Sequence, residues 1–341
     1  MKKYYINVQG GEGLNIGLAS FISYIKTNGD DNGNKDYEFY VCSPYLDIFE
    51  SCPYVSGTYK PQELRDFIFD SKANDGELVL HRLYDLDGFV KKQMNYSQAW
   101  AHLMNIPFTD TDKGTKVKSI LDPYAKYPAL KQQVDGLLNA IKQNGFDDFV
   151  IFQGTGGQSA LVSVPVGQDG KPDWSKVPYD SVNEPLRRRY PIDLTQKFID
   201  LFAKKHPKTA IVLYQLPNEP RPNNKNLIIA TMPYLAYYMI AKNAKGTISI
   251  DSSLQHLVAG VTKSVVLWAH SKPEAFGYSY NKNIEQKCRT DDLLYFSALG
   301  PSAAKVDYIE PEELLKEVDD YLESKSSSCV IGVAGNESET D

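Results

Sequence analysis

Short apolar runs alternate with longer amphipathic segments along most of the chain. The run at residues 4–8 (Tyr-Tyr-Ile-Asn-Val) is typical of a buried strand, whereas the apolar residues at 16–26 recur with the spacing of a helix. Asn28 and Gly29 then form a typical helix end. Repeated strand-helix units of this kind predict an α/β fold with mostly parallel sheets.

The same pattern divides the chain into two sets of units, separated by a polar, glycine-containing turn at residues 144–148. The expected strands are 4–8, 37–42, 54–59 and 78–80 before this turn, and 149–152, 210–214, 247–250 and 264–267 after it. The expected helices are 16–26 and 129–142 in the first set, and 194–205, 234–243 and 254–261 in the second.

The length of 341 residues agrees with two domains, since a domain averages about 150 residues. We expect one domain over residues 1–145 and a second over residues 146–323. The second is expected to carry an insertion at about 162–185 and to be followed by a mostly polar tail at 324–341. Two such domains in tandem leave a cleft between the carboxyl ends of two sheets, where α/β proteins bind ligands.

Charge and cysteine content exclude several classes of protein. The chain has 37 Lys+Arg against 43 Asp+Glu and a net charge of −6, which argues against a protein that wraps nucleic acid. The local exception is a run of three arginines at 187–189. The 4 cysteines show no CxxC spacing and no density typical of a disulfide framework, so we expect reduced thiols in a cytoplasmic protein.

We expect no signal peptide and no membrane-spanning segment. The apolar run near the N-terminus is too short and too polar for a signal peptide. The most apolar stretch, residues 227–241, contains a proline and is shorter than the roughly 20 residues of a membrane span. We interpret it as a strand-loop-helix junction.

The strongest chemical signal is the segment at residues 248–261, where a strand ends and a helix begins. Asp251 or Ser252 is suited to cap this helix, and the free N–H groups of its first turn then face an anion. His256 lies about one turn further on, on the face that carries Ser252 and Ser253. The alternative interpretation is an ordinary Ser/Asp cap with a core histidine.

Three further segments fit parts of a nucleotide. Thr155 and Gly156 lie in a glycine-rich turn after a strand, and such a turn lets backbone N–H groups approach a phosphate. The arginines at 187–189 precede a helix, where guanidinium groups suit a diphosphate. Glu219 follows the next strand, and its carboxylate suits the hydroxyls of a ribose. Each segment alone also fits a loop, a solvated charge run or a turn.

These four segments, in this order, resemble the C-terminal half of the glycosyltransferase family that contains the lipopolysaccharide heptosyltransferases (glycosyltransferase family 9). The run Asp-Ser-Ser-Leu-Gln-His-Leu-Val-Ala-Gly-Val at 251–261 is similar to that family's D-[ST]-G-x-x-H-x-A-A motif, with Ser253 in place of the glycine. Arg-Arg-Tyr-Pro at 188–191 resembles its K-R-W-P element, Leu-Pro-Asn-Glu at 216–219 its G-x-x-x-E element, and Ile-Glu-Pro-Glu-Glu-Leu at 309–314 its closing helix.

The resemblance implies a GT-B fold, in which two Rossmann-like domains place parallel sheets across a cleft, and a second domain that holds a nucleotide sugar. Within that domain the sugar and diphosphate would lie at 251–256, the phosphates near Thr155 and Arg189, and the ribose at Glu219. The donor-binding residues that it implies are Gly13, Thr155, Gly156, Arg188, Arg189, Glu219, Asp251, Ser252, Ser253 and His256.

The N-terminal half departs from the family at the residue taken as the general base. Family members carry an Asp at the end of a G-x-x-G-D loop, and this chain has Leu14 there if Gly13 is aligned with the second glycine. A leucine cannot accept a proton, so the resemblance does not identify the base. The carboxylates that we consider for catalysis are Glu12 on the same loop and Asp85 and Asp87 at another strand end, although each also fits a polar loop residue.

The sequence therefore predicts a glycosyltransferase that moves a sugar from a nucleotide-diphosphate sugar to a hydroxyl acceptor, without a metal and with no cofactor besides the donor substrate. Fixed hydrogen-bond donors and cations at the leaving diphosphate stabilise the transition state of such a transfer. The acceptor stays open between a saccharide, a glycolipid precursor and a modified base, and a nucleic acid enters only as an acceptor. The nucleotide base and the oligomeric state are also open.

Two alternatives remain at this stage. One is a non-catalytic protein that binds a nucleotide sugar and has lost the base. The other is a different enzyme on the same scaffold, such as a nucleotide-sugar epimerase or a phosphoryl-transfer enzyme.

Overall fold

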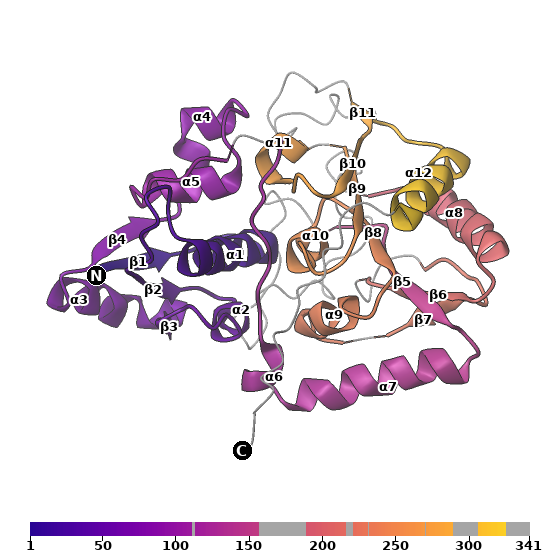
Figure 1. Ribbon diagram of the computed structural model, residues 1–341, viewed down its shortest axis with the longest axis horizontal. Helices are drawn as coiled ribbons and strands as arrows, with labels where there is room; N and C mark the ends of the chain where they lie inside the picture. The colour runs from indigo at the N-terminus through magenta and orange to yellow at the C-terminus, as the bar shows by residue number, and fades with distance from the viewer. Residues whose placement is uncertain are drawn as a thin grey trace, which may run out of the picture.

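The computed structural model describes residues 1–110, 113–156, 189–215, 221–230, 232–269, 271–288 and 306–324. The predicted insertion at 162–185, and the predicted tail apart from Ser324, lie outside these residues. The described chain forms two parallel sheets with helices packed around them (Figure 1). The predicted α/β class is thus confirmed.

The first body is a four-stranded parallel sheet in the order β3-β2-β1-β4, with its helices. Its strands are β1 (Lys2–Asn7), β2 (Tyr37–Cys42), β3 (Gly57–Tyr59) and β4 (Glu77–Leu80). Its helical segments are α1 (Glu12–Asn28), α2 (Leu46–Glu50), η1 (Pro61–Glu63), α3 (Leu64–Ala73), η2 (Leu83–Asp85), α4 (Asp87–Val90) and α5 (Tyr96–Leu103). Strand β1 buries Tyr4, Tyr5 and Ile6 in succession because a parallel sheet is covered on both faces.

The second body is a six-stranded parallel sheet in the order β10-β9-β8-β5-β6-β7, with its helices. Its strands are β5 (Asp148–Gln153), β6 (Thr209–Leu213), β7 (Leu227–Ile229), β8 (Gly246–Ile250), β9 (Ser264–Trp268) and β10 (Lys282–Glu285). Its helices are α6 (Pro123–Lys126), α7 (Ala129–Gln143), α8 (Ile192–Lys205), α9 (Tyr234–Ala241), α10 (Ser253–Leu257), α11 (Pro273–Phe276) and α12 (Pro311–Glu323). A short antiparallel pair, β11 (Lys287–Cys288) with β12 (Val306–Asp307), accompanies it.

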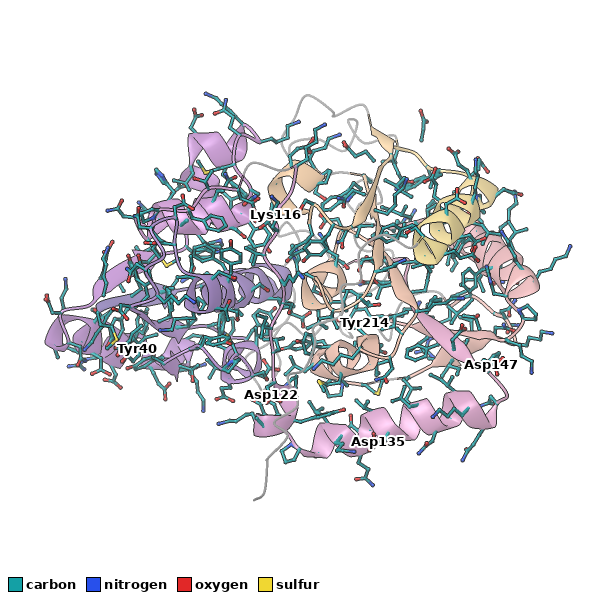
Figure 2. All side chains as sticks on the ribbon, in the orientation of Figure 1. Tyr40, Lys116, Asp122, Asp135, Asp147 and Tyr214 are labelled. Atoms are coloured by element: carbon teal, nitrogen blue, oxygen red, sulfur yellow. The ribbon has the colours of Figure 1, made fainter. Side chains whose placement is uncertain are left out.

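The chain passes from the first body to the second well before the turn at 144–148. The crossing segment runs down the junction from beside α11 to α6, and Lys116 and Asp122 are labelled on it in Figure 2 (Figures 1 and 2). The N–H of Thr115 donates to the carbonyl of Gly277 at 3.0 Å, and the N–H of Ser119 donates to the carbonyl of Ala259 at 2.8 Å. Helix α7 then packs on α9. The domain boundary at residue 145 stays a prediction, but the contacts of residues 115–143 are largely with the second body.

Most predicted elements have bounds close to the observed ones, and β2 matches its prediction residue for residue. The predicted junction at 227–241 is confirmed as β7 followed by α9. Helix α10 is shorter than predicted, because it ends at Leu257 and not at 261. The crossing segment explains the difference. The N–H of Ser119 donates to the carbonyl of Ala259, and Gly260 adopts a φ of 73° beside the side chain of Lys118.

The two bodies share one continuous apolar core. A single cluster of buried residues runs from β1 and α1 through α5 and α9 to α10 and β9. At its centre the hydroxyls of Tyr96 on α5 and Tyr278, which follows α11, lie 2.5 Å apart, and both rings are almost completely buried. Tyr278 also lies 3.0 Å from Nδ1 of His256 on α10. Burial raises the pKa of both phenols well above the usual value, so both stay protonated.

We predict that Tyr278→Phe destabilises the protein more than Tyr96→Phe does. Removing the Tyr278 hydroxyl leaves two buried polar groups without this partner, at a cost of about 1–3 kcal/mol, whereas removing that of Tyr96 leaves the bond between Tyr278 and His256 intact. Urea unfolding of the two variants measures the difference. Equal losses of stability, or a larger loss for Tyr96→Phe, would contradict this network.

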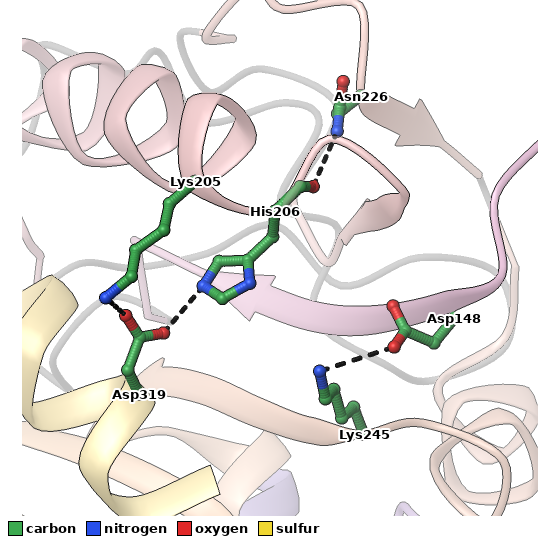
Figure 3. A network of polar contacts seen from close by, with 6 residues as sticks. All are labelled: Asp148, Lys205, His206, Asn226, Lys245 and Asp319. Atoms are coloured by element: carbon green, nitrogen blue, oxygen red, sulfur yellow. Dashed lines mark hydrogen bonds and ion pairs between the residues drawn. The ribbon is translucent and has the colours of Figure 1, made fainter. Parts of the chain in front are cut away.

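A second polar contact fixes α12 to the end of α8 (Figure 3). Nε2 of His206 lies 2.8 Å from Oδ1 of Asp319, and Nζ of Lys205 lies 2.5 Å from Oδ2 of the same carboxylate. The Asp319 side chain is 8% exposed and the His206 side chain 16%. Lys205 is half exposed, so its ion pair adds little. The buried bond between Asp319 and His206 therefore carries most of this contact.

We predict that Asp319→Ala lowers the free energy of unfolding by about 1–3 kcal/mol, because the imidazole of His206 loses its buried partner. Asp320→Ala is the matched control, since Asp320 is the next residue of α12 and is exposed. Urea unfolding compares the two. A control variant as unstable as Asp319→Ala would show that the loss does not come from this bond.

Candidate active site

The loop after β1 contacts the start of α10 in the second body. A Cβ added at Gly13 would lie 2.8 Å from Cδ2 of His256 and 3.7 Å from Cα of Ser253. Carbon atoms do not approach this closely, so a side chain at position 13 would displace the ring of His256, and glycine leaves the ring in place. Helices α1 and α10 pack together around it. The structure thus brings together Gly13, Ser253 and His256, three residues that the sequence singled out.

His256 is held at the junction by contacts on several sides. Its Nδ1 bonds with the hydroxyl of Tyr278, and its ring packs edge-on against Tyr96 at 5.5 Å. The residue is 6% exposed. The imidazole therefore contributes to the fixed contact between the bodies, and its Nε2 edge lies beside the Gly13 loop, 3.4 Å from the position of a Cβ there.

The side chains of Asp251 and Ser252 are engaged within the second body. One carboxylate oxygen of Asp251 accepts from the Gln255 amide at 2.9 Å, and the other accepts from the hydroxyl of Ser271. The hydroxyl of Ser252 donates to the Gln153 side chain and accepts from the N–H of Leu254, so Ser252 is the N-cap of α10. Both residues shape the turn after β8, as the capping interpretation predicted.

A hollow of about 200 Å³ opens at the carboxyl ends of β8 and β9, and we name it the Arg189 hollow. It is lined by Arg189, Ile250, Asp251, Leu267, Ala269, Ser271 and Gln286. Arg189 is held there by its backbone, since it pairs with Thr155 as an isolated antiparallel bridge. The N–H of Tyr190 also donates to the carbonyl of Gly154 at 2.6 Å. The predicted glycine-rich turn and the predicted arginine therefore lie side by side.

A second hollow, the Tyr214 hollow, opens to solvent at the carboxyl ends of β5 and β6, with about 330 Å³ of empty space that includes part of the solvent. Figure 2 labels Tyr214, which follows β6. Gly156 follows the lining residue Thr155 and is buried. The hollow is lined by Phe152, Gly154, Thr155, Tyr190, Ile192, Thr195, Leu213, Tyr214, Gln215 and Pro222. This mixture of aromatic faces with a few polar groups is typical of a small-molecule site.

The three predicted carboxylates have different surroundings. Glu12 is the first residue of α1 and is partly buried. Its charge interacts electrostatically with Tyr234 of the second body. The pKa of Tyr234 is raised well above its usual value, mainly by burial and further by Asp47 and Glu12. Asp85 and Asp87 are exposed and pair with neighbours on their own segment, Arg82 at 3.6 Å and Lys91 at 2.5 Å. Glu12 is therefore the predicted carboxylate that faces the junction.

Two of the residues predicted to bind the nucleotide sugar, Arg188 and Glu219, lie outside the described residues.

His81 is a residue of this region that the sequence did not single out. It directly follows β4, and its ring stacks on Trp100 with centroids 5.6 Å apart. Its Nε2 is buried and has no hydrogen-bond partner among the described residues. Burial lowers the pKa of the imidazole below its usual value, although a hydrogen bond with the Gln9 backbone opposes this shift. Its position directly after a predicted strand was the available signal.

No group of three or more His, Cys, Asp or Glu side chains suited to a metal ion is found within the described ranges. No helix of the described chain has the length and apolar character needed to cross a bilayer. The two described cysteine side chains, Cys42 and Cys52, are buried free thiols.

Solved structures share this fold over nearly the whole chain. A glycosyltransferase family 9 protein from Veillonella parvula superposes with a TM-score of 0.58 at 11% identity, over 94% of this chain and 97% of its own. E. coli ADP-heptose LPS heptosyltransferase II superposes with a TM-score of 0.53 at 12% identity, over 94% and 98%. No family model and no curated protein matches the sequence. The chain therefore has the GT-B fold that the sequence predicted, in the arrangement found in these glycosyltransferases.

Proposed function

We propose that the protein is a glycosyltransferase that moves a sugar from a nucleotide-diphosphate sugar to a hydroxyl acceptor. The observation that carries the proposal is the Arg189 hollow, which is lined by an arginine whose backbone pairs with the glycine-rich turn at the carboxyl ends of the second sheet. Ligands of open α/β sheets bind at this edge. The fold supports the same conclusion, because both of the similar structures described above are glycosyltransferases by name.

The donor is proposed to bind to the second body, with its diphosphate in the Arg189 hollow and its nucleoside in the Tyr214 hollow. Thr155 lines the Tyr214 hollow and pairs through its backbone with Arg189, so the two hollows are neighbours. Departure of the nucleoside diphosphate builds negative charge on its phosphates. Arg189 and the backbone N–H groups of the turn at 154–156 would stabilise that charge.

The acceptor is proposed to bind on the first body, against the loop from Gly10 to Gly13. This loop contacts the start of α10 at Gly13, so a hydroxyl placed on it would lie close to a sugar held by the second body. Asp251, Ser252 and His256 then act by holding the turn after β8 and the junction in place. We propose that they position the donor through these contacts.

We predict that the protein binds one class of nucleoside diphosphate and releases it from the matching nucleotide sugar. A panel of ADP-, UDP-, GDP- and CMP-sugars, with nucleotide release as the readout, identifies the donor. Arg189→Gln is expected to weaken binding of the nucleoside diphosphate by about 10-fold or more, because a charge-assisted bond to phosphate is lost. Calorimetric titration measures this affinity.

Arg65→Gln is the control, since Arg65 lies on α3 of the first body, where it packs over Phe69. Binding by the wild-type chain without release from any donor would favour the non-catalytic alternative. Equal affinities of Arg189→Gln and Arg65→Gln for the nucleoside diphosphate would contradict the proposal that the diphosphate binds in the Arg189 hollow.

We further propose that the transfer needs no metal, with Arg189 in the role that a divalent cation has elsewhere. EDTA is expected to leave the rate of nucleotide release within about twofold of the untreated rate. The reason is that Arg189 and backbone N–H groups stabilise the negative charge of the leaving diphosphate without a metal ion. Loss of turnover on chelation, restored by adding Mg²⁺ or Mn²⁺, would contradict this.

A further inference from the structure

His81 and Leu14 both lie beside the same backbone position, Gly10, in the β1–α1 loop. A Cβ added at Gly10 would lie 3.4 Å from Cε1 of His81 and 3.0 Å from Cδ1 of Leu14. The backbone N–H of His81 donates to the carbonyl of Asn7 at 3.1 Å, which fixes the end of β4 beside this loop. Although the loop carries an apolar side chain at Leu14, an imidazole from the neighbouring strand reaches the same place.

The loop also connects His81 to the proposed donor side. Gly10 contacts His81, and Gly13 contacts His256 of the second body. Consecutive Cα atoms are 3.8 Å apart, so three steps along the chain span at most about 11 Å. The two imidazoles therefore stand at the two ends of one short loop, His81 on the first body and His256 at the junction.

The Nε2 atom of His81 has an unmet hydrogen-bonding capacity. It is buried and has no partner in the described part of the chain, which is uncommon for a polar atom in a folded protein. The ring is held by its stack on Trp100, with an interplanar angle of 26°, and Tyr84 packs edge-on against it at 5.9 Å. Tyr84 is 39% exposed and lies at the surface, where side chains exchange rotamers quickly. A substrate hydroxyl would supply the missing partner.

The charge state of His81 suits proton transfer at neutral pH. Burial lowers its pKa below the ordinary value, so the imidazole is neutral at pH 7 and carries a lone pair. The titratable groups on the segments packed around the ring are Arg82, Tyr84 and Asp85 on its own side, Glu12 at the start of α1, and Tyr96 and His102 on α5. Arg82 and Asp85 form an exposed ion pair, so their charges offset each other.

We propose that His81 is the general base of the transfer, and this inference rests on the proposed function. Nε2 accepts the proton of the acceptor hydroxyl as the hydroxyl oxygen forms its bond to the anomeric carbon of the sugar. The bond from that carbon to the phosphate oxygen breaks, and the nucleoside diphosphate leaves with the electron pair. The imidazolium then returns its proton to solvent.

The test compares wild-type protein, His81→Gln and His102→Gln. His102 is an exposed histidine on α5, the helix that carries Trp100, and is the matched control. Calorimetric titration with the nucleoside diphosphate measures donor-site integrity. Nucleotide release from the active donor sugar, with water as the acceptor if no other is found, gives kcat and KM from pH 5 to 8.

His81→Gln is expected to bind the nucleoside diphosphate as wild type does, to keep its KM for the donor within about threefold, and to lose about 100-fold or more in kcat. The rate of the wild-type enzyme should rise with pH through a midpoint below the usual histidine value of about 6.5, because only the neutral imidazole accepts a proton. This acid limb should be absent from His81→Gln. Added imidazole should restore turnover to His81→Gly.

A kcat for His81→Gln within about threefold of wild type would overturn the role of His81 and leave the proposed function standing. The same holds if imidazole does not restore turnover to folded His81→Gly. If neither variant folds, a wild-type rate that does not change with pH between 5 and 8 overturns the role of His81. If the wild-type protein binds no nucleoside diphosphate, the proposed function is wrong, and the role of His81 falls with it.

Discussion

The close contact between Gly13 and α10 is the constraint on which the arrangement of the molecule depends. The first residues of α1 reach the imidazole of His256 only because position 13 has no side chain. This contact sets how the carboxyl end of β1 faces the carboxyl ends of β8 and β9. The buried Tyr96, Tyr278 and His256 then fix it with hydrogen bonds from both sides of the junction. The two proposed half-sites thereby face each other.

The two bodies share one buried apolar core at this junction. Apolar side chains from α1, α5, α9 and α10 form a single buried cluster, and the crossing segment adds main-chain bonds to Ala259 and Gly277. Domain motions are the default expectation when an interface is small and polar, but this interface is apolar and hydrogen-bonded. In this arrangement the Arg189 hollow opens at the end of the second sheet, and the Nε2 atom of His81 is buried.

Much of the fold was predictable because parallel sheets are buried on both faces. Strand β2 and helices α7 and α8 have apolar patterns that continue to their ends, so their bounds were nearly right. Helix α3 buries only Phe67 and Ser71, and its weak apolar stripe gave no prediction. Helix α5 was also missed, although the Asn95 and Gln98 capping box is a readable start signal.

The candidate site was predictable where function follows from local sequence, and not where it follows from packing. The turn at 251–256 and the pairing of Thr155 with Arg189 come from segments that the sequence singled out. His81 needs the neighbouring strand β4 to reach the β1–α1 loop, and Tyr278 needs the second body to meet the first. Nothing in the local sequence of either residue encodes these tertiary neighbours.

The most direct test of the proposed function is a crystal structure with the bound nucleoside diphosphate. The account predicts that the diphosphate lies in the Arg189 hollow, within hydrogen-bonding distance of Arg189, and that the nucleoside enters the Tyr214 hollow. A nucleotide bound on the first body, or one that leaves both hollows empty, would contradict it.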